Sequence, residues 1–346
     1  MDEKPITSDI LEDILAQPML LKDALQQHLT KDSALDAAAR GVMEMRPRRI
    51  VLTGMGSSLF ASYGAYLHLL NVGLGAIWIP LAELLHYAAG QIGPDTLIIV
   101  VSQSGETIEA LRLLADRRPN AILAITNNPA STLAKEARWV ILTGAGPEQS
   151  VATRTYTCSL LALSLLAGRI AGASPRELEA NLSPAIAAAA RVAAQAPEHI
   201  AALPDFWRSD GPLTIIGRGP SLCTALSGGL LFKETAKLPV EGMSSAQFRH
   251  GPLEIAGPGH RAIVCTAPGP TLALDSRLAA ELRHAGSDVL MIGPGEEPAP
   301  HIVMPESAYA ELYTIIPIQL LARECAIQRG ITPGSFRYIG KVTTSE

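Results

Sequence analysis

The stretch that decides the fold is Ile98-Ile99-Val100-Val101-Ser102-Gln103-Ser104-Gly105-Glu106-Thr107. Its apolar, largely β-branched first half predicts a buried strand, and the residues from Glu106 onward carry apolar side chains at helical spacing. A strand that ends in Ser-Gln-Ser-Gly before a helix directs hydroxyls, an amide and free helix-start N–H groups at one point. This arrangement predicts an anion site, most naturally for a phosphate, because a helix N-terminus supplies partial positive charge. A polar turn with an ordinary N-cap is the alternative interpretation.

Strand and helix patterns alternate on both sides of this stretch. Further strand-like runs lie at 50–52, 76–80, 121–126 and 139–142, with helical patterns between them. This alternation predicts a parallel, doubly wound sheet with helices on both faces. Ahead of the first strand, we expect a short helix at 10–16 that ends at Gln17-Pro18 and a longer one at about 20–45.

The second half of the chain repeats features of the first. Residues 52–58 are echoed by 215–221, and 100–107 more weakly by 264–271, at offsets of 163 and 164 residues. Two matches at nearly one offset predict an internal duplication. The glutamine and the second serine of the first loop become alanine and proline in the second. Only the first copy is therefore expected to keep an anion-binding loop.

The predicted fold class is α/β, with two tandem doubly wound parallel-sheet domains joined by long helices. The long helices are expected at 155–171 and 177–202. The expected organisation is N-terminal helices at 1–45, a first domain at 46–172, a helical connection at 173–208, a second domain at 209–330 and a C-terminal tail at 331–346.

Composition excludes several classes of function. The net charge of the 346 residues is −5, and the only basic cluster is at 46–49, so nucleic-acid binding has little electrostatic support. The N-terminus lacks the pattern of a signal peptide, and the most apolar run, 159–168, is too short to span a bilayer. The four cysteines show neither metal-ligand nor disulfide spacing. We expect a cytoplasmic protein with reduced thiols, no metal and no membrane partner.

A second hydroxyl-rich turn, Ser57-Ser58, follows the strand at 50–52. If that strand neighbours the strand at 97–101, both turns can grip one phosphate. Binding of a dinucleotide at Gly54-Met55-Gly56 is less well supported, because Leu59 replaces the third glycine and no acidic residue ends the next strand. No Gly-Lys-Ser/Thr follows, which excludes a P-loop. Ser57-Ser58 alone would indicate no more than an N-cap.

Three side chains elsewhere could carry chemistry. Glu234 continues a row of Leu222, Leu226 and Leu230, where partial desolvation would favour a general base, although pairing with a neighbouring lysine is the alternative. His250 lies in a loop before Gly251-Pro252 and is either functional or merely solvated. Lys341 lies in an apolar tail that could pack down and partly bury the amine. The polar loop at 145–155 either closes a site or caps the next helix through Ser150 or Thr153.

Together these motifs resemble the sugar isomerase (SIS) family. The likeness is greatest to the isomerase half of glucosamine-6-phosphate synthase and to SIS-type glucosamine-6-phosphate deaminases and deglycases. It covers nearly the whole chain, from Leu11 to Thr343, and rests on the Ser-Gln-Ser-Gly-Glu-Thr loop and on Lys233-Glu234 followed by His250-Gly251-Pro252.

The resemblance implies a set of site residues. It implies a sugar phosphate held by Ser58, Ser102, Gln103, Ser104 and Thr107, with a backbone contact from Val151. It further implies Glu234 as the base between C1 and C2, His250 as the ring-opening group and Lys341 at the open-chain carbonyl. In the family this histidine reaches in from the neighbouring subunit, so a homodimer is implied. No cofactor is implied.

Departures from the family pattern narrow the expected activity. We expect no glutaminase domain ahead of the isomerase half. Leu231 replaces a lysine, and Arg337 and Lys341 are what remains of the usual tail motif. We therefore expect an amino-sugar phosphate deaminase/isomerase, acting on glucosamine 6-phosphate, rather than a synthase. The alternatives are a deglycase or an aldose–ketose isomerase for another phosphosugar and, from a different class, a non-catalytic phosphosugar sensor.

Overall fold

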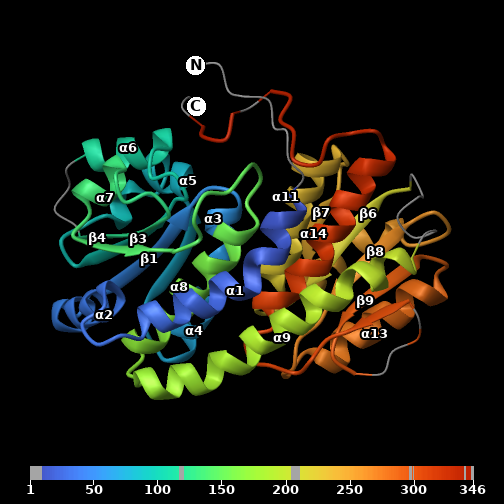
Figure 1. Cartoon of the computed structure of the whole chain (residues 1–346), viewed down its shortest axis with the longest axis horizontal. Helices are drawn as coiled ribbons and strands as arrows, with labels where there is room; N and C mark the ends of the chain where they lie inside the picture. The colour runs from blue at the N-terminus through green and yellow to red at the C-terminus, as the bar shows by residue number, and fades with distance from the viewer. Residues whose placement is uncertain are drawn as a thin grey trace. The chain divides into compact units, whose positions relative to one another are not determined.

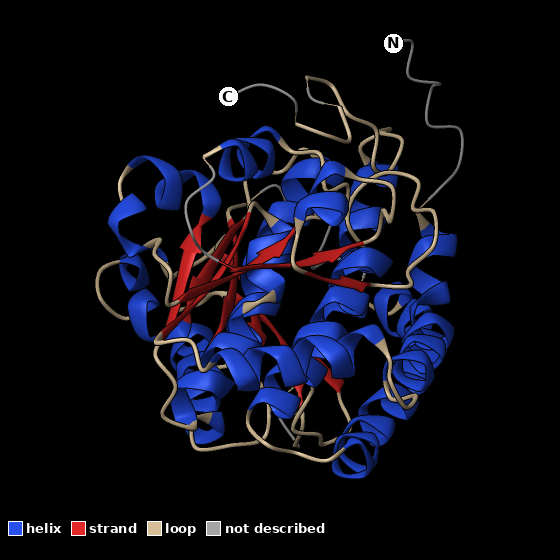
Figure 2. Cartoon of the chain, turned by 90° about the vertical axis from the view of Figure 1, so that its left-hand side faces the viewer, coloured by secondary structure: helices blue, strands red, loops and turns tan. Residues whose placement is uncertain are grey.

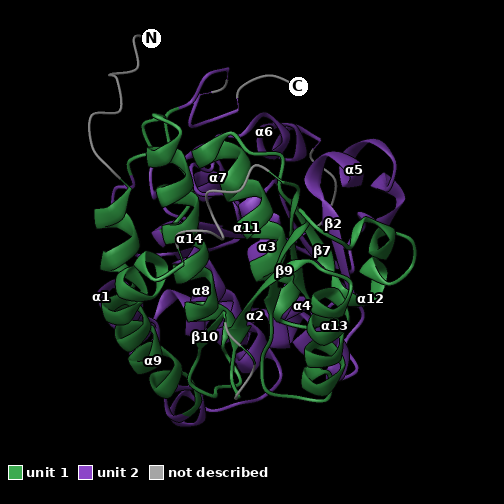
Figure 3. Cartoon of the chain, turned by 90° about the vertical axis from the view of Figure 1, so that its right-hand side faces the viewer, with its two compact units in different colours: residues 1–18, 149–153, 181–335 green, residues 19–148, 154–180, 336–346 purple. Residues whose placement is uncertain are grey.

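The computed structural model describes residues 10–116, 121–203, 211–295, 298, 300–338 and 340–343. The chain divides into two compact units, which Figure 3 colours separately. Unit 1 comprises residues 1–18, 149–153 and 181–335, and unit 2 comprises residues 19–148, 154–180 and 336–346. Each unit is built around one parallel sheet with helices on both faces (Figure 2).

The sheet of unit 2 contains the strand that the opening motif predicts. Its strands are β1 (Arg49–Gly54), β2 (Ala76–Pro80), β3 (Thr96–Val101), β4 (Ala121–Thr126) and β5 (Trp139–Leu142). They pair in parallel in the order β2-β1-β3-β4-β5. The predicted alternation of strand and helix is confirmed. The order reverses between β1 and β3, which is where ligands collect in sheets of this kind.

Helices cover both faces of this sheet (Figure 1). One face packs against α5 (Leu81–His86), α6 (Ile108–Ala115) and α7 (Thr132–Glu136) around a core that includes Ile98 and Val100. The other face carries α2 (Ala34–Met45), α3 (Ser57–Ala61), α4 (Tyr63–Asn71) and α8 (Arg154–Ile170). A short 3₁₀ helix, η1 (Ala89–Gln91), precedes β3. Because both faces are covered, the strands read as continuous apolar runs.

Unit 1 has a sheet of the same topology. Its strands are β6 (Leu213–Gly217), β7 (Glu241–Ser244), β8 (Arg261–Cys265), β9 (Asp288–Gly293) and β10 (His301–Val303), in the order β10-β9-β8-β6-β7. The matching strand orders agree with the predicted echo between the two halves. One face packs against α12 (Ser245–Phe248) and α13 (Leu272–His284), and the other against α11 (Ser221–Ala236), which in turn packs against α14 (Glu311–Gln328). The 3₁₀ helix η2 (Pro252–Ile255) follows α12.

The expected helix break at Pro18 is wrong. Helix α1 (Leu11–His28) continues through this proline. Pro18 has no N–H to donate to the carbonyl of Ile14, but the side-chain amide of Gln17 donates to that carbonyl at 2.8 Å and replaces the missing bond. The helix ends instead at His28, and α2 begins after Ser33. The Ser33 hydroxyl accepts from the N–H of Asp36 at 3.1 Å and caps α2.

The two long helices predicted after β5 are present. Helix α8 spans Arg154–Ile170, and α9 spans Pro175–Ala201. Among the described residues, no helix combines the length and the apolar character that crossing a membrane would require.

Candidate functional site

The two hydroxyl-rich turns of unit 2 lie side by side. Strands β1 and β3 are direct neighbours, and Gly54 is the register partner of Val101. The approach is so close that a Cβ atom on Gly54 would lie 2.7 Å from the carbonyl oxygen of Val101. The condition for joint phosphate binding by Ser57-Ser58 and the 102–107 loop, that their strands be neighbours, is therefore met at the point where strand order reverses.

Hydrogen bonds inside the 102–107 loop change which of its groups are available to an anion. The N–H of Gly105 donates to the Ser102 hydroxyl at 3.1 Å, and the N–H of Glu106 donates to the Ser104 hydroxyl at 3.2 Å. The expectation of several free N–H groups is therefore wrong for these two. A serine that accepts a bond keeps its own O–H proton as a donor. The loop thus turns backbone N–H groups inward and leaves hydroxyl protons for a ligand.

Gly105 and Glu106 fix the loop against α7. Gly105 has φ +65°, and a Cβ atom there would lie 2.6 Å from Cβ of Ser131, so both backbone shape and space require glycine. The Glu106 carboxylate accepts from the N–H of Thr132 at 2.5 Å and from its hydroxyl at 3.0 Å. Ser131 caps the same helix through the N–H of Ala134. The loop shape is thereby set by the next helix of the sheet.

The C-terminal tail reaches the end of this loop. Thr107 is the N-cap of α6, but its side chain makes no capping hydrogen bond to the described residues of that helix, 108–115. The first helical N–H, that of Ile108, donates to the carbonyl oxygen of Thr343 at 3.2 Å. The N–H of Ile108 is therefore also taken, by the tail. The prediction that the tail packs down is confirmed within unit 2.

Lys341 is half-buried and donates through Nζ to the backbone carbonyl of Glu148. The carboxylate of Glu148 accepts from the N–H of Thr155 at 3.0 Å and from its hydroxyl at 2.6 Å, in the first turn of α8. Ser150 or Thr153 was the predicted cap of this helix. Glu148 was not predicted as its cap, because its position does not match the spacing of a capping box. Glu148 therefore connects the start of α8 to the tail lysine.

Glu234 and Val151 belong to unit 1. Glu234 lies in the last turn of α11, and its row with Leu222, Leu226 and Leu230 is half-buried rather than the fully buried face of that helix. The Lys237 ammonium donates to the backbone carbonyl of Glu234. Val151 is buried.

His250 also belongs to unit 1 and follows α12 directly. Its side chain is exposed, and its N–H donates to the carbonyl of Gln247 at 2.9 Å. The next residue, Gly251, has φ +120°, which turns the chain sharply after the histidine. The predicted residues are thus divided, since Ser57, Ser58, the 102–107 loop and Lys341 belong to unit 2.

The corresponding edge of the second sheet holds a carboxylate of its own. Arg218 follows β6 and donates through Nε to the Ser245 hydroxyl at 2.8 Å, and Ser245 donates to Asp275 at 2.6 Å. The Arg218 and Asp275 charges lie 3.7 Å apart. Burial raises the pKa of Asp275, while the Ser245 and Arg218 contacts oppose that rise. At this edge the second sheet therefore has the Asp275 carboxylate, whereas the first sheet has serine and threonine hydroxyls. The spacing of residues in the sequence did not predict this carboxylate.

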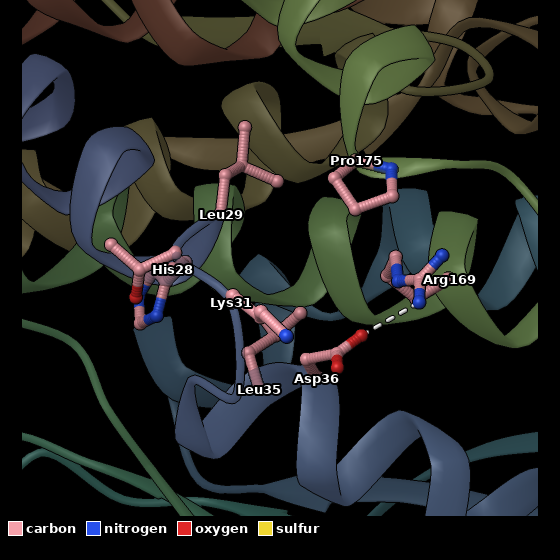
Figure 4. A pocket seen from close by; sticks show the side chains of 8 residues that line it. His28, Leu29, Lys31, Leu35, Asp36, Arg169 and Pro175 are labelled. Carbon is pink, nitrogen blue, oxygen red and sulfur yellow. Dashed lines mark hydrogen bonds and ion pairs between the residues drawn. The ribbon is translucent and has the colours of Figure 1, made fainter.

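A separate cavity of about 280 Å³ lies in unit 2, away from the predicted residues. Figure 4 shows Asp36 and Arg169 on its wall, joined by an ion pair of 2.6 Å. His28 also lines it and is 5% exposed, and its burial lowers the pKa to about 4. Among the described residues, no cluster of His, Cys, Asp or Glu has the arrangement of a metal site.

Comparison with known proteins agrees with this geometry. Residues 45–169, which include β1 to β5 and both hydroxyl-rich turns, match the family model of the SIS domain. This part of the chain is a SIS domain. The resemblance drawn from the sequence motifs is confirmed.

Known relatives extend the likeness over the rest of the chain. A glutamine–fructose-6-phosphate aminotransferase (isomerizing) from Pyrococcus horikoshii is 29% identical over 97% of this chain, which spans 58% of that relative. The C-terminal domain of glucosamine-fructose-6-phosphate aminotransferase from Francisella tularensis shares the fold with a TM-score of 0.84, at 22% identity over 95% of this chain and 98% of that one. Glucosamine-6-phosphate deaminase from Thermotoga maritima gives 0.81, at 23% identity over 98% and 100%.

Proposed function

We propose that this protein is an amino-sugar phosphate deaminase/isomerase that converts glucosamine 6-phosphate and water to fructose 6-phosphate and ammonia. The observation that carries the proposal is the bond between Ile108 and Thr343, because it holds the tail that bears Lys341 at the end of the hydroxyl-rich loop. The Ile108–Thr343 bond joins the end of the proposed phosphate-binding loop to the segment that carries the Lys341 amine. This arrangement suits a substrate with a phosphate at one end and a carbonyl at the other.

Phosphate binding is assigned to the two turns of unit 2. Ser58, Ser102, Ser104 and Thr107 would donate hydroxyl protons to the phosphate oxygens, with Ser57 and the Gln103 amide beside them and a backbone contact from Val151. Hydrogen bonds to a charged acceptor are about twice as strong as neutral ones. Holding the phosphate restricts where C1 and C2 can lie, and such positioning can supply several kcal/mol of rate enhancement.

The chemistry is assigned to three side chains. His250 would move the proton that opens the pyranose ring, which frees the C1 aldehyde. Lys341 would polarise this carbonyl or condense with it. Glu234 would take the proton from C2 and return it to C1, so that the C2 amine becomes a ketimine, and water would then release ammonia and leave the C2 ketone. His250 would come from the second subunit of a homodimer.

The test is to incubate purified protein with glucosamine 6-phosphate and follow ammonia and fructose 6-phosphate together. Equal formation of both supports the proposal. Ketose without ammonia, from another phosphosugar, would instead favour an aldose–ketose isomerase, and release of an amine from a fructosamine phosphate only would favour a deglycase. Binding without turnover on any of these substrates would favour the sensor.

A matched pair of variants assigns the base. Glu234→Gln should abolish exchange of the C2 proton with solvent while phosphate binding persists, because the amide cannot accept that proton. Glu241→Gln is the control, since Glu241 is an exposed carboxylate of the same unit. Unchanged C2 exchange in Glu234→Gln would remove Glu234 from the mechanism.

A further inference from the structure

The helix that precedes His250 is too short to hold its own position. Helix α12 has four residues, Ser245–Phe248, and Arg249 and His250 follow at once. A single helical turn is unstable by itself, because several backbone angles are fixed for very few hydrogen bonds. The position of His250 therefore depends on what α12 and Arg249 contact in the rest of unit 1.

The first contact lies at the start of α12. The hydroxyl of Ser245, which is fully buried, donates to the Asp275 carboxylate on α13 at 2.6 Å. Asp275 is 2% exposed, and the guanidinium of Arg218 lies 3.7 Å from it. A buried carboxylate that accepts a hydroxyl proton beside a guanidinium makes a strong, directional attachment. It ties the first residue of α12 to the first turn of α13.

The second contact lies at the other end of the same turn. Arg249, the residue before His250, pairs with Glu281 on α13 at 2.7 Å. Both side chains are partly exposed, so this ion pair contributes less than the buried one. Between them, Phe248 is fully buried and its ring stacks on that of His260 with centroids 6.2 Å apart. One helix, α13, thus holds both ends of the segment that presents His250.

We infer that α13 positions His250 through Asp275 and Glu281, and that these two carboxylates are positioning residues for ring opening. The inference rests on the proposed role of His250. Neither carboxylate touches the substrate in this scheme. Asp275 acts through Ser245, and Glu281 acts through Arg249, so the loss of either should misplace the imidazole without changing the phosphate-binding turns of unit 2.

The test compares Asp275→Ala, Asp275→Asn and Glu281→Gln with Tyr313→Phe. The control removes another buried hydrogen bond of unit 1, the 2.6 Å bond from the Tyr313 hydroxyl to the carbonyl of Pro305. Two quantities are measured. One is the amide hydrogen exchange of residues 245–251, and the other is kcat and KM for glucosamine 6-phosphate.

Asp275→Ala should speed exchange across residues 245–251 about tenfold and lower kcat about 10- to 100-fold, with KM changed less than about twofold, because small misplacements of a reacting group cost rate rather than binding. Asp275→Asn should recover part of both, since its amide oxygen can still accept from Ser245. Glu281→Gln should have the smallest effect of the three. Tyr313→Phe should change neither quantity beyond a general loss of stability.

Three outcomes would overturn the inference. Unchanged exchange at 245–251 in Asp275→Ala would show that α13 does not hold this segment. Faster exchange with an unchanged kcat would show that the segment is held but that its position does not matter to the reaction. A change in exchange and kcat in Tyr313→Phe as large as that in Asp275→Ala would show that the effect is a general loss of stability. If the wild-type protein turns over no phosphosugar, the proposed function fails instead, and the exchange measurement still decides whether α13 holds the segment.

Discussion

The N–H of Ile108, the first residue of α6, donates a hydrogen bond of 3.2 Å to the carbonyl oxygen of Thr343 in the C-terminal tail. This bond lies at the end of the 102–107 loop of the SIS domain and attaches the tail there. It also takes up a backbone donor that an anion would otherwise use.

Lys341→Met should lower kcat for ammonia release about 100-fold or more, because general acid–base or covalent participation of one side chain supplies about that factor. The affinity for glucosamine 6-phosphate, measured by calorimetry, should change little, since the proposed phosphate contacts come from the 102–107 loop. Val342→Ala, in the same tail segment, is the control. Equal kcat in Lys341→Met and the wild type would exclude the lysine from the reaction.

Ser102→Ala and Ser104→Ala should each weaken binding of the sugar phosphate about tenfold, because each loses a hydroxyl donor to a charged oxygen, worth about 1.5 kcal/mol. Binding is measured by titration calorimetry with glucosamine 6-phosphate. Thr266→Ala, at the equivalent strand end of unit 1, should bind as the wild type does. An equal loss in the Thr266 variant would point to general destabilisation.

Gly105→Ala should destabilise the fold by about 1–3 kcal/mol and abolish phosphate binding, because alanine adopts the φ of +65° with strain and meets Ser131. The free energy of unfolding is measured with urea. Adding Ser131→Gly should relieve the steric contact but not the backbone strain, so it should restore stability only in part. Full recovery in the double variant would show that the backbone angle is unimportant.

His28 should make the protein less stable as the pH falls from about 6.5 to about 4. Burial lowers its pKa from 6.5 to about 4, so between these values the unfolded chain binds the proton and the folded chain does not. At 1.36 kcal/mol per pKa unit, the loss across this window is about 3 kcal/mol. Urea unfolding at several pH values should show a flatter profile for His28→Leu. An unchanged slope would contradict the shift.

The sequence predicted most of the architecture because apolar strands buried on both faces leave a clear pattern. The run at 97–101 and its neighbours fall where β3 and the other strands of unit 2 lie. The order of the strands in the sheet has no such local pattern, because the adjacency of β1 and β3 depends on contacts between distant segments. Only the structure could show that Gly54 pairs with Val101.

The errors have equally local causes. Pro18 reads as a helix breaker, but the Gln17 side chain supplies the missing donor to Ile14. Glu148 and Asp275 carry no recognisable spacing, since each contacts groups that the fold brings near it. The 102–107 loop is predicted to be an anion site, while its internal hydrogen bonds could not be predicted from residue types alone.

The hydrogen bonds that attach the C-terminal tail to unit 2 have backbone carbonyl groups as their acceptors. Lys341 donates to the main-chain carbonyl of Glu148, and Thr343 offers its own carbonyl to Ile108. Carbonyl groups are present whatever the side chain, so substitutions at positions 148 and 343 leave both acceptors in place. Changes of side chain at these two positions are therefore compatible with the same chain path for the tail that carries Lys341.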